Sequence, residues 1–303
     1  DKILFEKFTK ETGIKINVIK GSADQLIQRL QSEGKKSPAD ILITVDAGRL
    51  VRAKKLGLLQ PISSSKLMRN VPEIMRDSEN FWFGLSVRAR VIVYAKERVN
   101  EGELSTYEDL ANPKWNGRIL IRSSNNIYNQ SLLASIIKSN GTEKALEWAK
   151  LVRSNMARKP RGNDRDQARA VASGVADLAV INTYYLGLLA NSSNKKDIEI
   201  ANKLKVFFPN QEGRGTHINI SGGGVTASSK NKKEAIRFLE FLTDAKSQKI
   251  FSESNFEYPL DYKNAKAEIF SEWGNFKADD IELSILGLKN AEAVKLFDIA
   301  GWE

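Results

Sequence analysis

The chain opens with an amphipathic pattern of apolar and charged positions. Apolar residues at positions 4, 5 and 8 form one face of a helix, and Asp1 is placed to cap it. Gly13 ends this helix, and residues 14–19 alternate as a short strand does. Because an α/β chain normally opens with a strand, we expect a first strand and a secretory signal upstream of Asp1.

The next pattern predicts a repeat of helix and strand. Ser22 and Gln25 have the spacing of a capping box for a helix over residues 22–32. Residues 39–45 form a nearly continuous apolar run, which suits a strand buried on both faces, and residues 48–55 predict a helix. Strand and helix alternating at this spacing indicate βαβ units and an α/β fold.

Two longer strand-like runs divide the chain. Residues 81–95 are well beyond the usual strand length, and residues 216–221 form a second run before three glycines. Strands of this kind cross between lobes, so we expect two α/β lobes joined by a hinge of crossing strands, with a ligand in the interlobe cleft. The predicted lobes are residues 1–87 plus 222–262 and residues 88–221 plus 263–303.

The remaining patterns belong mainly to the second predicted lobe. Short apolar runs predict strands at residues 119–121 and 176–181. Amphipathic runs predict helices at residues 129–139, 142–154, 164–173 and 232–243.

Composition narrows the chemistry. The 303 residues favour two lobes, and they include no cysteine and one histidine, His217, which excludes disulfides, thiolate nucleophiles and His-rich metal sites. A lone histidine in a predicted strand is interpreted as a structural hydrogen-bonding residue. No run reaches the roughly 18 apolar residues of a membrane span.

The net charge of +10 does not by itself indicate a nucleic-acid partner. The basic residues are scattered, the cluster at residues 158–161 is short, and no recognised nucleic-acid motif accompanies them. Solvated surface is the favoured interpretation, and attraction to an anionic membrane surface stays open.

Tyrosines mark the candidate site. Tyr184 and Tyr185 follow the predicted strand at residues 176–181, and Tyr128 follows the strand at residues 119–121 after a polar loop. In open α/β sheets, ligands bind at the carboxyl ends of strands, so these side chains are candidates for one site. The alternative is that all three are packing residues.

Three converging phenols would favour one kind of ligand. Each ionises near pH 10, so deprotonating one at pH 7 costs about 4 kcal/mol and three cost roughly 12 kcal/mol. Only a strong Lewis acid offsets that cost. Softer metals prefer thiolate or imidazole, so a hard cation such as ferric iron is the consistent choice.

These residues resemble a known family. The chain is similar to the periplasmic ferric-iron-binding proteins of ABC importers, the Fut/Fbp group of substrate-binding proteins, over essentially its whole length. The matching stretches include Asn182-Thr183-Tyr184-Tyr185 and residues 39–50, 84–90, 121–132, 217–222 and 257–259.

The resemblance implies a type II periplasmic-binding-protein fold, a function and a site. It implies capture of Fe(III) by Tyr128, Tyr184 and Tyr185, with Arg88 neutralising excess phenolate charge or holding an anion or water. Asp46, Arg49 and Asn126 are further cleft candidates, Asp46 and Arg49 at the lip of the first lobe.

It also implies a periplasmic monomer that delivers iron to an ABC permease. Proteins of this group begin with a strand and a loop carrying His-Tyr, which here would precede Asp1, so we expect a first-lobe ligand to be absent from residues 1–303.

Three other functions are alternatives to iron binding. Arg88 and the loop at residues 123–126 could bind a small anion without metal. An enzyme would need a general base, for which the chain offers His217 and scattered carboxylates, so we expect none. A DNA-binding regulator would need a helix-turn-helix segment, which the sequence lacks.

Overall fold

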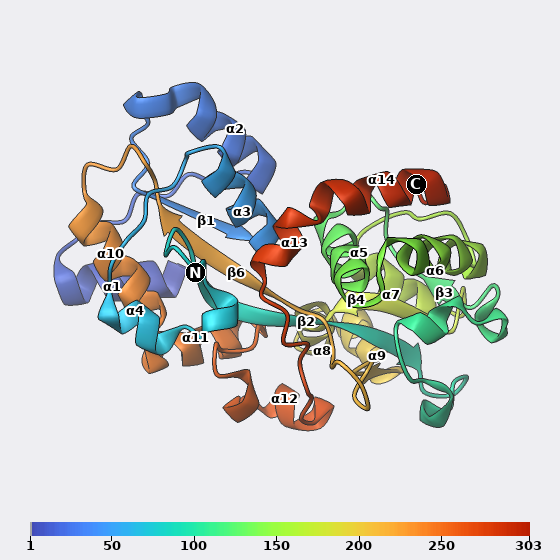
Figure 1. The fold of residues 1–303 in the computed structure, drawn as a ribbon. Helices are drawn as coiled ribbons and strands as arrows, with labels where there is room; N and C mark the ends of the chain where they lie inside the picture. Colours follow the sequence, from blue (N-terminus) through green and yellow to red (C-terminus); the bar gives the residue numbers. More distant parts are fainter. Residues whose placement is uncertain (1) are drawn as a thin grey trace.

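A computed structural model describes residues 2–303, and Asp1, the predicted helix cap, lies outside them. Figure 1 shows two lobes joined by two crossing strands, β2 and β6, as the sequence predicts. The first lobe contains β1, α1–α4 and α10, and the second contains β3–β5, α5–α9 and α14. The strands are β1 (Ile41–Val45), β2 (Phe83–Ala95), β3 (Ile119–Leu120), β4 (Leu178–Asn182), β5 (Leu204–Phe207) and β6 (Ile218–Val225).

Helices cover both lobes, and no helix among residues 2–303 is both long and apolar enough to cross a membrane. The helices are α1 (Lys2–Thr12), α2 (Ala23–Glu33), α3 (Ala47–Lys55), α4 (Ser65–Asn70), α5 (Ile127–Asn140), α6 (Thr142–Asn155), α7 (Asp164–Ala172), α8 (Thr183–Ala190), α9 (Lys195–Asn202), α10 (Lys232–Leu242), α11 (Ala245–Asn255), α12 (Glu268–Trp273), α13 (Ser284–Leu288) and α14 (Asn290–Ala300). The predicted capping box of Ser22 and Gln25 is present at the start of α2.

Strand β2 belongs to both lobes. Its first half pairs antiparallel with β6, from Phe83 opposite Gly223 to Ala89 opposite Ile218. Its second half pairs antiparallel with β4 and β5, beginning with Arg90 opposite Asn182. The strand order is β1-β6-β2-β4-β3, with β5 beside the end of β2. Arg88 and Arg90 therefore lie where the two lobes meet.

The prediction of a strand at residues 14–19 is wrong. Within the described chain this segment is extended but pairs with no strand, and Val18 and Ile19 are 48% and 53% exposed. Alternation indicates a strand only where a neighbouring edge supplies backbone partners. The βαβ unit expected from residues 14–45 is therefore not formed. Strand β1 pairs antiparallel with β6, whereas β3 pairs parallel with β4, so the sheet is mixed.

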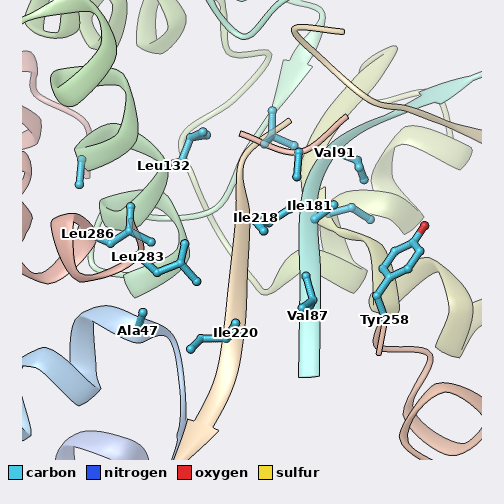
Figure 2. Close-up of a cluster of buried hydrophobic side chains, with 14 of the residues drawn as sticks. Ala47, Val87, Val91, Leu132, Ile181, Ile218, Ile220, Tyr258, Leu283 and Leu286 are labelled. Carbon is cyan, nitrogen blue, oxygen red and sulfur yellow. The ribbon is translucent and has the colours of Figure 1, made fainter. Parts of the chain in front are cut away.

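A third connection between the lobes is the short helix α13. It contacts α3 of the first lobe and α5 of the second. Figure 2 shows Leu283 and Leu286 between Ala47 on α3 and Leu132 on α5, and both leucines are fully buried. An added Cβ at Gly287 would lie 2.5 Å from the Cβ of Val51, so the close approach of α13 to α3 requires glycine. An apolar seam thus runs across the interlobe boundary.

Candidate metal centre

The first tyrosine of the site lies at the start of a capped helix. The Asn126 side chain accepts a hydrogen bond from the backbone N–H of Tyr128 at 3.0 Å and caps α5. The Ser123 carbonyl accepts from the Asn126 N–H, which closes the preceding turn. Asn126 was predicted as a cleft candidate, and in the structure it fixes the helix start that carries Tyr128.

The other two tyrosines lie at the start of α8, directly after β4. The Tyr184 and Tyr185 ring centroids are 4.2 Å apart. The Oη atoms of Tyr128 and Tyr184 are 3.3 Å apart and share a hydrogen bond. The structure therefore brings together the three tyrosines that the sequence singles out, all from the second lobe.

Arg88 is buried beside the tyrosines. Its Cζ lies 5.8 Å from the ring centroids of both Tyr128 and Tyr184. Its Nη2 donates to Ser221 Oγ and lies 3.5 Å from a Glu257 carboxylate oxygen, while Nε and Nη1 have no partner among the described residues. Burial disfavours the guanidinium's charge, but Glu257 and the two phenols hold the pKa of Arg88 above its ordinary value.

The Tyr184 and Tyr185 phenols are protonated at neutral pH in the absence of a cation. Burial raises the pKa of Tyr184 well above 10.0, the neighbouring Tyr128 adds to the rise, and Arg88 opposes it. Burial also raises the pKa of Tyr185. A cation that uses these oxygens must therefore displace protons, which selects for a strong Lewis acid.

The donor set fits a hard, highly charged cation. The converging ligand atoms are phenol oxygens, and the described residues 2–303 contain no group of three His, Asp or Glu side chains placed to hold a metal ion. Oxygen donors favour hard cations over softer transition metals.

Asp46 does not lie on an exposed cleft lip, which corrects the prediction. It is fully buried at the N-terminus of α3, where Oδ1 accepts from Gly48 N at 2.8 Å. Ser131 on α5 donates to both carboxylate oxygens at 2.9 and 2.8 Å, and Asn219 Nδ2 donates at 2.8 Å. Burial raises the pKa of Asp46. The residue is an interlobe contact because Ser131 belongs to the opposite lobe.

Arg49 is also engaged within the protein. Its Nη2 donates to Asp24 on α2 at 2.9 Å. The family resemblance implies a place at the cleft lip for Arg49, and in the structure the carboxylate of Asp24, also in the first lobe, binds its guanidinium.

The interpretation of His217 as a hydrogen-bonded structural histidine is only partly right. Its backbone N–H donates to Tyr107 Oη at 3.1 Å, but Nδ1 is buried without a partner among the described residues. Burial, with Arg214 and Arg90 nearby, lowers the pKa of His217 to about 3. It lines a narrow polar pocket with Arg88, Arg90, Tyr128, Asn182 and Asn219.

Sequence reasoning missed Arg90. Arg88 and Arg90 are two positions apart on β2, so their side chains share one face of the strand. Both are buried, and Arg90 Cζ lies 5.9 Å from the Tyr128 ring centroid. The sequence feature that could have identified Arg90 is a second arginine in a mainly apolar strand. A charge that is buried in such a strand requires polar partners, which indicates a specific role.

Two lobes joined by crossing strands, with ligand-type side chains at the junction, define a solute-binding protein. Residues 36–282 match the family model described as bacterial extracellular solute-binding protein, and the chain belongs to that family.

Individual proteins with similar sequences or structures support this family membership. The chain is 50% identical over 303 residues to iron uptake protein A1 of Synechocystis, covering all of this chain and 84% of that protein. It is 31% identical to an Fe(3+)-binding periplasmic protein of Serratia marcescens, covering 84% of this chain and 73% of the relative. A Trichodesmium structure (IdiA, FutA) in complex with iron and citrate superposes with a TM-score of 0.97 at 53% identity, covering 100% and 96% of the two chains. The resemblance and the predicted fold class are confirmed.

Proposed function

We propose that this chain is an extracytoplasmic Fe(III)-binding protein that captures iron through Tyr128, Tyr184 and Tyr185. The observation that carries the proposal is the phenol pair of Tyr128 and Tyr184, whose Oη atoms are 3.3 Å apart, with the Tyr185 ring centroid 4.2 Å from that of Tyr184. The names of the relatives in Synechocystis and Serratia support ferric iron as the ligand.

Charge supports this ligand set. Three phenolates balance the charge of Fe³⁺, and water or another ligand would complete the coordination shell. Arg88 lies close enough to both rings to stabilise phenolate charge. Because the Tyr184 and Tyr185 phenols are neutral before binding, iron capture through them releases protons.

The family supports the wider setting. We place the protein in the periplasm and propose an ABC permease as its partner, since solute-binding proteins of importers deliver their ligand to a permease. We propose a binding role without catalysis because the buried His217, with a pKa of about 3, is a poor general base at neutral pH. We also propose the lobe boundaries given from the sequence, residues 1–87 plus 222–262 for the first lobe and residues 88–221 plus 263–303 for the second.

The test is a visible absorption titration of chelator-stripped protein with ferric citrate. We expect a broad tyrosinate-to-iron charge-transfer band that is lost or strongly reduced in Tyr185→Phe. The matched control is Tyr262→Phe, which removes a phenol stacked on Phe276 outside the cluster. Unchanged iron affinity in Tyr185→Phe would overturn the ligand assignment.

The same protein also tests the anion alternative. In the structure the loop at residues 123–126 uses Asn126 and the Ser123 carbonyl to cap and close the start of α5. Isothermal titration with phosphate in metal-free buffer should therefore show no heat of binding at the micromolar level. Tight phosphate binding, with no iron band, would favour the anion function.

A further inference from the structure

Arg90 binds three side chains at the base of the tyrosine cluster. Its Nη1 donates to Asp164 Oδ2 at 2.6 Å and to Asn182 Oδ1 at 3.2 Å. Its Nη2 donates to Asn129 Oδ1 at 2.7 Å. These contacts use both terminal nitrogens of one guanidinium, whose planar fork fixes the directions of its partners.

The partners of Arg90 are neighbours of the tyrosines in sequence. Asn129 directly follows Tyr128 at the start of α5. Asn182 is the last residue of β4, two positions before Tyr184. The guanidinium therefore connects the two helix starts that carry the phenol pair.

Further bonds make these connections rigid. Asp164, the first residue of α7, also accepts from the Asn182 backbone N–H at 3.1 Å. Asn129 Nδ2 donates to the carbonyls of Arg122 and Ser123 at 2.7 and 3.1 Å. The loop before α5 and the end of β4 are thus held to the same arginine.

Burial makes this network sensitive to change. The side chains of Arg90 and Asp164 are 1% and 0% exposed, and Arg122 Nη1 lies 3.5 Å from the second Asp164 oxygen. Removing one partner of a buried ion pair leaves the other charge without compensation. Lysine keeps the charge at position 90 but cannot direct hydrogen bonds to three fixed partners.

We propose that Arg90 is a positioning residue that holds the starts of α5 and α8 together and thereby sets the Tyr128–Tyr184 phenol separation on which iron affinity depends. This inference rests on the proposed function. Outer-shell partners of metal ligands typically contribute about 10–100-fold to affinity, and we expect a loss in that range for Arg90→Lys.

The first experiment compares Arg90→Lys with Arg98→Lys in the full chain. Arg98 is the matched control because it also bonds several groups, Asp177 Oδ1 and the Val171 and Ala176 carbonyls, but belongs to a different cluster. Iron affinity is measured by competition with citrate, the charge-transfer band by visible absorption, and stability by thermal unfolding of metal-free protein. We expect only Arg90→Lys to shift the band and weaken iron binding.

A second pair of variants serves if Arg90→Lys does not fold. Asn129→Ala removes the oxygen that accepts from Arg90 together with the bonds to the Arg122 and Ser123 carbonyls. The control, Gln130→Ala, removes a side-chain bond to the Ser124 carbonyl of the same loop and leaves the contacts of Arg90 in place. We expect Asn129→Ala to bind iron about 10-fold more weakly, with a shifted band, and Gln130→Ala to bind as the wild type does.

The outcomes separate the two proposals. A wild-type chain without an iron band overturns both. A wild-type band with affinity and band position unchanged in Arg90→Lys, or with equal losses in Asn129→Ala and Gln130→Ala, overturns the positioning role alone.

Discussion

The two sides of the interlobe boundary differ in what their polar groups do. On the second-lobe side, the rings of Tyr128, Tyr184 and Tyr185 gather, and the Oη atoms of Tyr128 and Tyr184 hydrogen bond to each other. On the first-lobe side, Asp46 accepts hydrogen bonds from Ser131, Asn219 and its own helix, and Arg49 is paired with Asp24. One side presents ligands, and the other is occupied by contacts within the protein.

This difference separates binding from closure. A ligand favours a closed arrangement only as far as it interacts differently with the two states. Here Asp46–Ser131 and the α13 seam of Leu283 and Leu286 join the lobes through protein contacts alone. The three tyrosines proposed to bind iron therefore lie in the second lobe, while the contacts that join the lobes come from both.

The largest expected effect comes from removing a second-lobe phenol. Tyr184→Phe deletes the oxygen that pairs with Tyr128, so iron affinity should fall by more than the ~10–100-fold typical of outer-shell changes. Citrate competition measures the loss, and Tyr94→Phe, whose phenol bonds to Glu101 elsewhere, is the control. Equal iron affinity in Tyr184→Phe and Tyr94→Phe would show that the Tyr184 phenol is not an iron ligand.

The second prediction concerns pH. Burial raises the phenol pKa values of Tyr184 and Tyr185 above 10.0, so both are protonated throughout the neutral range and must lose protons to bind iron. Apparent iron affinity should therefore rise with pH between about 5 and 8. A pH-stat should record fewer protons released per iron in Tyr185→Phe than in the wild type, and equal release would exclude that phenol as a ligand.

A smaller effect is expected at the interlobe contact. Ser131→Ala leaves the buried Asp46 carboxylate short of a donor, which should lower the free energy of unfolding by about 1–3 kcal/mol. Urea denaturation measures this, with Ser135→Ala as control because its hydroxyl bonds to Leu132 within the same helix. The variant should retain its iron band. Loss of the band would show that the first lobe contributes to binding.

The smallest effect is expected at Arg49. Its pair with the half-exposed Asp24 is a surface ion pair, so Arg49→Ala should cost under about 1 kcal/mol of unfolding free energy. Iron affinity should match that of Arg52→Ala, which loses the other arginine paired with Asp24. A selective loss of iron binding in Arg49→Ala would place this arginine in the site.

Local sequence patterns predicted much of the fold and the convergence of the three tyrosines at one site. The capping box at Ser22 involves residues three apart, and the long crossing strand is a long run of mostly apolar residues, so both are visible in the sequence. The convergence of the tyrosines could be predicted because each follows the end of a strand, and the fold brings these strand ends together.

What the sequence did not predict depends on distant partners. Residues 14–19 alternate as a strand does but pair with no strand in the described chain. The contact of Asp46 with Ser131 joins residues 85 positions apart, and that of Arg90 with Asp164 spans 74. A polar residue's partner is set by the three-dimensional fold, so its role could not be inferred from spacing.

The most direct test of the account is a crystal structure of the iron-loaded chain with anomalous diffraction measured across the iron absorption edge. We expect one iron peak bonded to the phenolate oxygens of Tyr128, Tyr184 and Tyr185, with Asp46 still hydrogen bonded to Ser131. An iron peak held by carboxylates, or one that leaves any of the three phenols unbound, would contradict it.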